Sequence, residues 1–536
     1  MNSNTNDKSI AGGGESGLVV DGLSSAAERS QNTNSSSSSR KRPFNIMLDG
    51  NDDTHTAAAA ESSTNTNDQA LSRANILQQN SDMRIELNTA HNKRVELEQR
   101  CIELTKRNQE LEIKVKDLTL KNEYNEWKYT AEDIPDFYWS EQGFNEEYIR
   151  KMNTWLAKMK KSTDLLRRGD PMENLNISNG GTNTIIHLFH DDILLTHWKE
   201  FADALVQYQK FNHRENYGIE RLFTWNIEFD REVLDMLAPI LKTTAVKKLS
   251  FGGYDFGSEM VSFVADILEA SPHIQGIGLY NNRIDSVDDM RRFCKSITDR
   301  NSDINTVEAR LFQSFDGNNP EMMRMVLDAS HQLEKLFLKN NGIGNVGTDL
   351  IANFLASNPP MKELDLTGNN LNDTDATLLA NTLQSNTNLK RLQISSNDIT
   401  DIGRKALLES VFNISSLNAC VATNHTCHIH GLTPDISDIN KYTKALNRTM
   451  KIFTMLAATD DGFFNMNCLG DLSYKLIPDV LRLAQKFRGK TPALSEAYFE
   501  QTGQRSADWN KLVDKKTVPI TSLFELLRGW AVPSLA

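Results

Sequence analysis

The chain has 536 residues and a net charge of −12, and 39% of its residues are hydrophobic. This length corresponds to about three to four domains, and the acidic balance makes the chain a poor match for nucleic acid or an anionic membrane. No apolar run approaches the roughly 20 residues of a membrane span, the N-terminus lacks a secretory signal, and five scattered cysteines fit a reducing compartment. We therefore expect a soluble protein of the cytoplasm or the nucleus, with no membrane contact.

Residues 1–72 form a tail rich in serine, asparagine, threonine and glycine. Such a segment buries too little apolar surface to offset its ordering entropy, so we expect it to be disordered. Arg40, Lys41 and Arg42 form a short basic cluster within it. This cluster is either a nuclear-import signal or a chance group of solvated charges.

Residues 73–123 carry the clearest helical pattern, a coiled coil of the leucine-zipper type. Leucine recurs every seven residues at heptad position d, and position a holds a cysteine, an asparagine and a valine. The predicted dimerisation residues are therefore Leu97, Cys101, Leu104, Asn108, Leu111, Val115 and Leu118. Leucine at d with one asparagine at a favours a parallel two-stranded coiled coil.

The flanking charges agree with a parallel homodimer, in which Lys93 faces Glu98 of the other copy and Arg107 faces Glu112. Two alternatives stay open: pairing with a different protein, and a single amphipathic helix that lies on the downstream domain. The spacing resembles the zipper of basic-leucine-zipper transcription factors over residues 94–121. The basic region that should precede the leucines is missing, so we expect no direct DNA binding.

Residues 124–182 are rich in aromatic and charged side chains, and we expect short helices there that cap the next domain. Residues 183–416 contain a repeat. Three consecutive units of 28 residues fit the pattern L-x-x-L-x-L-x-x-N-x-L followed by a helical stripe, namely 333–360, 361–388 and 389–416. Weaker units begin at Ile304, Ile274, Val246, Ile219 and near Asn183.

Each repeat predicts a short strand followed by a helix, and stacking buries a face that one unit alone leaves open. An asparagine recurs just after the predicted strand, at Asn282, Asn341, Asn369 and Asn397. We expect these amide side chains to bond buried peptide groups where the chain turns inward.

The repeat resembles the ribonuclease-inhibitor type of leucine-rich repeat, which ribonuclease inhibitors share with Ran GTPase-activating proteins and the sensing domains of nucleotide-binding innate receptors. The resemblance implies an α/β solenoid, a horseshoe with an inner parallel sheet and outer helices, which recognises a protein partner on its concave side. Here this horseshoe follows the disordered tail and the coiled-coil helix.

Residues 417–536 depart from the repeat. Leu417, Cys420 and Ala422 predict one more strand, and the segments 437–458, 471–487 and 520–529 predict helices. We expect a helical cap that shields the last repeat from solvent.

The strand pattern predicts which side chains line the concave face. The residues chosen for partner binding are Phe189, Phe223, Trp225, Tyr280, Arg310, Phe337 and Lys339. Exposed aromatic side chains on a rigid sheet are typical of binding hot spots. The alternatives are that the N-terminal cap or the zipper helix covers these rings, or that the predicted register is in error.

Metal-type ligands cluster only at Cys420, His425, Cys427, His428 and His430. Packing residues and a zinc site are both compatible with this spacing, and the close spacing favours packing. No catalytic or phosphate-binding motif is found, and we expect no cofactor and no enzymatic activity.

The sequence therefore predicts a non-enzymatic adaptor or scaffold, which dimerises through the coiled coil and binds a protein of unknown identity on the repeats. One alternative is a regulator of a small GTPase, through the resemblance to Ran GTPase-activating proteins, although the acidic C-terminal segment of that family is absent. The other is a nuclear, transcription-linked zipper protein.

Overall fold

The computed structural model describes residues 65–179, 186–214, 217–253, 257–299, 308–457 and 472–486. Most of the predicted tail and the predicted helix at 520–529 lie outside these residues. Contacts divide the chain into two units, Met1–Leu97 and Glu98–Ala536. The second unit contains the repeats. A single helix, α1 (Asn65–Glu126), carries the heptad pattern.

Two helices precede the sheet, α2 (Asp136–Glu141) and α3 (Glu146–Arg168). Asn145 caps α3 by accepting a hydrogen bond from the backbone N–H of Tyr148, and Gly169 ends the helix in the left-handed conformation, at φ 67°. The inner side of α3 packs against α4 (Leu195–Gln209), where Trp155 and Trp198 have ring centroids 5.7 Å apart. Both rings are fully buried, so this helix pair closes the N-terminal end of the core.

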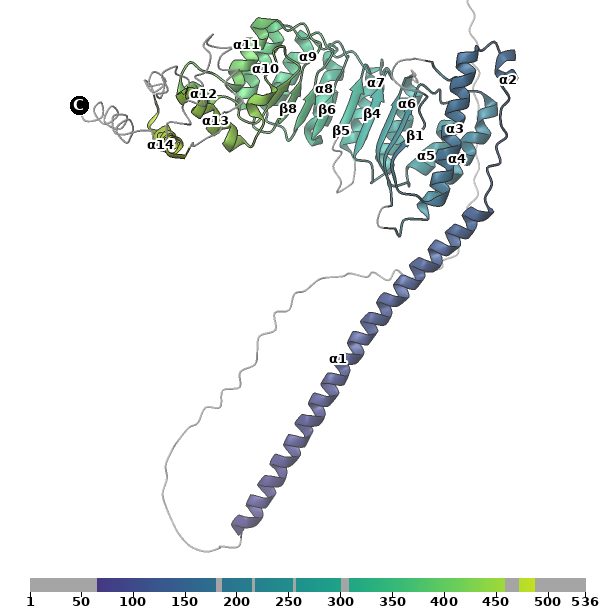
Figure 1. Cartoon of the computed structure of the whole chain (residues 1–536), viewed down its shortest axis with the longest axis vertical. Helices are drawn as coiled ribbons and strands as arrows, with labels where there is room; N and C mark the ends of the chain where they lie inside the picture. The colour runs from purple at the N-terminus through teal and green to yellow at the C-terminus, as the bar shows by residue number, and fades with distance from the viewer. Residues whose placement is uncertain are drawn as a thin grey trace, which may run out of the picture. The chain divides into compact units, whose positions relative to one another are not determined.

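The sheet has nine parallel strands in sequence order, from β1 to β9 (Figure 1). The strands are β1 (Met172–Asn176), β2 (Ile219–Trp225), β3 (Val246–Gly252), β4 (Gly276–Tyr280), β5 (Glu308–Phe312), β6 (Lys335–Phe337), β7 (Glu363–Asp365), β8 (Arg391–Gln393) and β9 (His428–His430). Parallel neighbours need a crossover connection, and a helix supplies it between successive strands up to β8.

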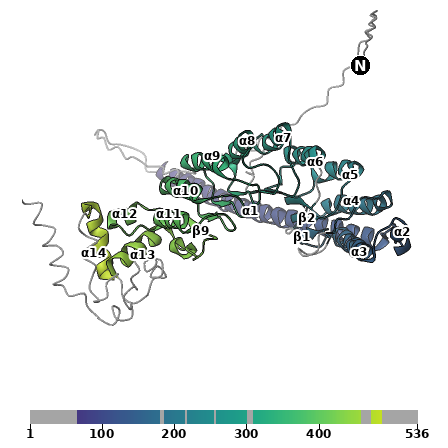
Figure 2. The ribbon, with the colours of Figure 1, turned by 90° about the horizontal axis from the view of Figure 1, so that it is seen from above.

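These helices follow one another along one side of the sheet (Figure 2). After α4 they are α5 (Arg231–Leu241), α6 (Gly257–Ala270), α7 (Val287–Thr298), α8 (Pro320–Ala329), α9 (Asn345–Ala356), α10 (Asp373–Ser385) and α11 (Asp401–Val411). One position of the register is buried beneath them in every strand from β2 to β8 and builds the core, namely Leu222, Leu249, Ile277, Ala309, Leu336, Leu364 and Leu392, and β3, β4 and β5 add Phe251, Leu279 and Leu311. We call the opposite face of the sheet the inner face.

The predicted role of the recurrent asparagines is confirmed. The amide nitrogen of Asn369 donates to the carbonyl oxygens of Leu338 (2.9 Å) and Leu366 (2.8 Å). Its amide oxygen accepts from the backbone N–H groups of Asn341 (2.9 Å) and Ile343 (3.1 Å). The side chains at 282, 341 and 397 likewise donate to carbonyl groups of the preceding repeat. Each asparagine therefore joins two neighbouring repeats through buried peptide groups.

Two predictions about the ends of the sheet are wrong. The first strand is β1, inside the segment predicted as a cap, and the residues described near 183 contribute only an isolated bridge between Leu188 and Ile227. At the other end Leu417–Ala422 is a short helix, α12, and the ninth strand follows at His428–His430. The side chain of Ser416 accepts a hydrogen bond from Ala419 and starts that helix, and Leu417 and Cys420 are spaced for one helix face rather than for strand alternation.

After β9 come α13 (Lys444–Ala457) and α14 (Ile477–Lys486). Four short 3-10 helices complete the described elements: η1 (Asp192–Leu194), η2 (Ser330–Gln332), η3 (Ser437–Asn440) and η5 (Tyr474–Leu476). The buried side chains of Ile452, Met455 and Leu456 on α13 belong to the same core as Ile429 on β9. These helices therefore extend the core beyond the last strand.

Candidate protein-binding surface

The parallel register aligns the side chains of the inner face into three rows across the strands. The first row is mostly charged and contains Arg221, Lys248, Gly276, Glu308, Lys335, Glu363, Arg391 and His428. The middle row contains Phe223, Ser250, Gly278, Arg310, Phe337, Asp365, Gln393 and His430. The third row contains Trp225, Gly252, Tyr280 and Phe312, and backbone hydrogen bonds continue it through Lys339, Thr367 and Ser395.

Aromatic side chains form one continuous group on this face, which we call the aromatic cluster: Phe223, Trp225, Tyr280, Phe312 and Phe337. The rings of Phe223 and Trp225 are stacked, with centroids 6.1 Å apart. Tyr280 meets Trp225 edge to face at 5.7 Å and Phe312 at 4.6 Å, and Phe312 meets Phe337 at 6.5 Å. These are favourable aromatic geometries, so the cluster spans β2 to β6 without a break.

Two glycines give the rings their place on the sheet. A Cβ atom at Gly252 would lie 2.6 Å from the Trp225 ring and 2.6 Å from the Cβ of Tyr280. A Cβ atom at Gly278 would lie 2.7 Å from the ring of Tyr280. Side chains at these two positions would therefore displace the rings, and the backbone of β3 and β4 serves as their floor.

Cations cover the far end of the aromatic cluster. The guanidinium carbon of Arg310 lies 4.0 Å from the ring centroid of Phe337, and the ammonium group of Lys339 lies 5.3 Å from that of Phe312. Such contacts are attractive because the ring faces carry negative partial charge. Phe337 is buried, whereas the other four rings are half-buried and keep part of their surface open.

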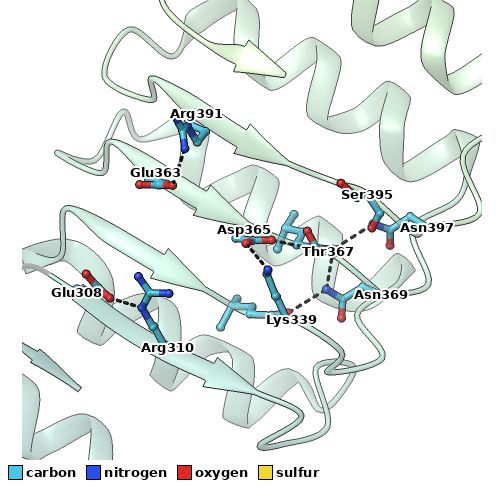
Figure 3. A network of polar contacts seen from close by, with 12 residues as sticks. Glu308, Arg310, Lys339, Glu363, Asp365, Thr367, Asn369, Arg391, Ser395 and Asn397 are labelled. Atoms are coloured by element: carbon cyan, nitrogen blue, oxygen red, sulfur yellow. Dashed lines mark hydrogen bonds and ion pairs between the residues drawn. The ribbon is translucent and has the colours of Figure 1, made fainter. Parts of the chain in front are cut away.

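Ion pairs connect the charged side chains of the inner face (Figure 3). The buried carboxylate of Glu308 pairs with Arg310 and, at 3.5 Å, with Lys248. Although burial alone would raise the pKa of Glu308, its hydrogen bond and attraction to Arg310, with the help of Lys248, keep that pKa below its ordinary value. Glu308 therefore stays ionised and holds both cations in place.

The next strands repeat this arrangement. The carboxylate of Glu363 lies 3.6 Å from Lys335 and 3.6 Å from Arg391. The carboxylate of Asp365 lies 3.3 Å from Lys339 and accepts a hydrogen bond from the backbone N–H of Thr367 at 3.0 Å. This half of the inner face is thus polar, and the aromatic half lies beside it.

Six of the seven side chains chosen from the sequence lie on the inner face. Phe189 does not, because the residues around it form no strand of the sheet. Its ring stacks instead on Phe144 (6.2 Å) and Tyr148 (6.4 Å), and its backbone N–H donates to the Tyr148 hydroxyl at 3.1 Å. Phe189 therefore belongs to an aromatic group beside α3, where its side chain is 45% exposed.

The register predicted for the repeat at 304 is also wrong. Counted from Ile304, the repeat pattern places Arg310 just after the third apolar strand residue, the position that Tyr280 has in the preceding repeat, but Tyr280 pairs with Phe312, and Arg310 pairs with Gly278. The repeat that leads to β5 is longer than its neighbours, so its strand begins later than the regular pattern predicts. Sequence reasoning consequently missed Phe312. The alternation of Ala309 and Leu311 as core residues could have placed Phe312 on the opposite, inner face of the strand. Sequence reasoning also missed Arg221, which precedes Phe223 on the same face.

The last turns of α1 belong to the second unit and pack beside the end of α4. Leu120 is buried, and the carboxylate of Asp117 lies 2.9 Å from the imidazole of His213 and 3.0 Å from Arg214. Glu123 binds Lys210 at 2.9 Å, and its carboxylate also accepts from Gln207. The docked residues occupy heptad positions b, c and f, so this contact uses the side of the helix away from positions a and d.

The residues at heptad positions a and d are exposed on α1. The side chains of Leu104, Leu111, Val115 and Leu118 are 53%, 52%, 63% and 57% exposed. Such a stripe of large apolar side chains is unusual on a solvated surface. Cys101 is exposed as well, whereas the other described cysteines, Cys294, Cys420 and Cys427, are buried.

The suggested metal-ligand cluster is built into the C-terminal core. Cys420 and Cys427 are buried, and Nδ1 of His425 accepts a hydrogen bond from the ammonium group of Lys451, 3.2 Å away. Burial, with Lys451 as the next cause, lowers the pKa of His425 to about 3. His428 and His430 lie apart, on β9, with parallel rings. Within the described residues no group of three or more histidine, cysteine, aspartate or glutamate side chains is arranged to hold a metal ion.

Comparison with known families agrees with this architecture. A leucine-rich-repeat family model matches residues 357–380 and 385–408. These matches and the parallel sheet with a helix between successive strands fit a leucine-rich-repeat protein, whose fold is typically a scaffold for protein interaction. A search of the curated proteins found no match. No helix of the described chain is long and apolar enough to cross a membrane.

Proposed function

We propose that this protein is a non-enzymatic adaptor, which binds a protein partner through the inner face of its leucine-rich repeats. The observation that carries the proposal is the aromatic cluster, in which Phe223, Trp225, Tyr280 and Phe312 keep part of their surface open on a rigid sheet. Half-exposed aromatic rings surrounded by polar side chains are typical of binding hot spots. In the described residues no ring contact joins this cluster to α1, α2 or α3.

The test is a pull-down from native lysate with the Phe223→Ser, Trp225→Ser double variant. A matched control is Phe137→Ser, because Phe137 is an exposed aromatic residue on α2 away from the sheet. We expect wild type and the control to capture the same defined protein and the double variant to lose it, with equal circular dichroism and melting. Equal capture by all three proteins would contradict the proposal.

The adaptor is proposed to be a parallel homodimer through α1. The support is the exposed stripe of Leu104, Leu111, Val115 and Leu118, together with the complementary charges that flank it. The contact of Asp117 and Glu123 with the repeat unit uses other sides of the helix and leaves the stripe free to pair. A dimer presents two inner faces, which raises the affinity for clustered targets through effective concentration alone.

Cys101 offers a direct test of this dimer, because a parallel in-register coiled coil brings the two Cys101 side chains face to face at position a. Mild oxidation with copper phenanthroline should then link two chains in wild type and fail to do so in Cys101→Ser. Light scattering should give twice the monomer mass, and Leu111→Glu with Leu118→Glu should restore the monomer. A wild-type monomer at micromolar concentration would contradict the dimer and leave the inner-face proposal untouched.

The five cysteines are odd in number and scattered along the chain, which favours a reducing compartment, and we propose the cytoplasm or the nucleus as the location. A fluorescent fusion imaged in cells tests this assignment, and deletion of residues 40–42 tests whether the basic cluster directs nuclear import. Secretion of the fusion would contradict it.

A further inference from the structure

The inner face has a charge balance opposite to that of the whole chain. The complete sequence has 59 Lys and Arg against 71 Asp and Glu. In the three rows of the inner face the cations are Arg221, Lys248, Arg310, Lys335, Lys339 and Arg391, and the carboxylates are only Glu308, Glu363 and Asp365. This surface therefore carries an excess of positive charge on an acidic protein.

The ion pairs show where the excess lies. Glu308 is shared between Lys248 and Arg310, and Glu363 is shared between Lys335 and Arg391. One carboxylate balances two cations at both places, so each group keeps one net positive charge. Asp365 and Lys339 balance each other.

Arg221 adds a third positive charge beside the aromatic cluster. Across the described residues no ion pair within 4.0 Å joins Arg221 to a carboxylate, and its side chain is half-buried on β2, two residues before Phe223. Its charge also acts on the hydroxyl of Tyr280. The rings of the cluster are thus flanked by Arg221 at one end and by Arg310 at the other.

The shared carboxylates also fix the cations in space. Lys248 reaches Glu308 across Gly276, where a Cβ atom would lie 3.1 Å from the lysine side chain. A cation that is already held by a buried carboxylate loses little rotamer entropy when it meets a second anion. The inner face therefore offers ordered cations next to apolar rings.

From this charge pattern we infer that the partner docks through an acidic segment that also carries aromatic or aliphatic side chains. The apolar side chains of the partner pack on Phe223, Trp225, Tyr280 and Phe312. Its carboxylates approach Arg221 and the two pairs of cations that each share one carboxylate of the sheet, around Glu308 and around Glu363. Such complementarity sets specificity and the rate of association. The inference rests on the proposed function, because it names the chemistry of the partner at that same surface.

A single-stranded nucleic acid is the competing ligand for a basic and aromatic surface. The geometry favours the peptide, because the rings already stack and meet edge to face with one another, and Phe337 is covered by Arg310. A base therefore finds few free ring faces on which to stack.

The experiment is selection of a random 16-residue phage-displayed peptide library on the full-length protein, with counter-selection on the Phe223→Ser, Trp225→Ser variant. We expect the enriched peptides to be acidic and to contain aromatic or aliphatic residues. Synthetic copies should bind in fluorescence polarisation with an affinity that falls as salt rises. Replacing their Asp and Glu residues by Asn and Gln should weaken binding by about tenfold or more.

The protein side of the test is Arg221→Glu, with Arg231→Glu as the matched control, because Arg231 is 75% exposed on α5. The first variant should weaken the affinity for the acidic peptide by about tenfold. The control should change this affinity by less than about twofold. Enriched peptides that depend on Phe223 and Trp225 but are neutral or basic would overturn this inference and leave the proposed function standing. Tighter binding of a single-stranded RNA 20-mer would also overturn it. Selection of no peptide that depends on the cluster would contradict both proposals.

Discussion

Lys451 on α13 is fully buried in the core that follows the last strand. Its ammonium group donates to the carbonyl oxygen of Asn424 at 2.7 Å and lies 3.2 Å from Nδ1 of His425. Burial lowers the pKa of Lys451 from 10.5 to about 7, although the nearby thiols Cys420 and Cys427 act in the opposite direction. We predict that Lys451→Met stabilises the protein at neutral pH.

The magnitude follows from the pKa. A fall from 10.5 to about 7 corresponds to about 5 kcal/mol of unfavourable burial of the charged form. The Asn424 carbonyl keeps another donor, the side chain of Asn440 at 3.1 Å, whereas Nδ1 of His425 loses a partner, which costs about 1–3 kcal/mol. The substitution should therefore raise the free energy of unfolding by about 2–4 kcal/mol at pH 7.

The sign of this effect depends on pH. Below pH 7 the lysine is protonated in both the folded and the unfolded state, so the cost is fully present. Above pH 7 the folded state releases its proton while the unfolded state keeps it up to about pH 10.5, so the stability of wild type rises by about 1.4 kcal/mol per pH unit. The advantage of Lys451→Met should consequently shrink and reverse between about pH 8.5 and pH 10.

The assay is urea unfolding followed by circular dichroism at several values between pH 6 and pH 10. Lys444→Met serves as the control, since Lys444 is exposed at the start of the same helix. Subtracting the two variants removes the titration of other groups. A difference in the free energy of unfolding between the two variants that stays constant over this pH range would refute the lowered pKa of Lys451.

Three further predictions concern the sheet and α1. Gly252→Ala should displace Trp225 and weaken partner capture, because the added Cβ would lie 2.6 Å from that ring. Unchanged capture would contradict the claim that the glycine backbone of β3 sets the position of the Trp225 ring. Asn369→Leu should lower the free energy of unfolding by about 1–3 kcal/mol for each buried peptide group that it leaves unpaired, whereas Asn370→Leu at an exposed site should have little effect in the same urea titration. Asp117→Ala should speed hydrogen exchange in the last turns of α1, because its contacts with His213 and Arg214 are lost; unchanged exchange would contradict a role of these two contacts in holding the helix.

The regular repeats were predictable because leucine and asparagine positions recur with a fixed period. The 28-residue spacing of Leu336, Leu364 and Leu392 identifies the core side of the strands. The residues directly before and after each of these leucines must then face the other side of the sheet. Phe223, Trp225 and Tyr280 consequently lie on the inner face as predicted. Phe312 was missed since the longer repeat before β5 breaks the period.

Other features depend on contacts between segments that are distant in the sequence. Lysine is a surface residue by default, and only the fold brings Lys451 under Asn424 and His425. The heptad pattern predicts only which face of α1 pairs through positions a and d. It does not predict the contacts of Asp117 and Leu120, which lie at other heptad positions. The GTPase-regulator and transcription-linked alternatives stay predictions, because no contact described above tests either of them.

Photo-crosslinking from the inner face tests the central claim most directly. Benzoylphenylalanine at position 312 places the reactive group in the aromatic cluster, and the same residue at position 402 places it on α11, where Ile402 is 71% exposed on the other side of the sheet. We predict that illumination in native lysate links one defined protein to position 312 and not to position 402, and that Phe223→Ser with Trp225→Ser abolishes the product. Equal products at both positions, or a product that survives the double variant, would contradict partner binding on this face.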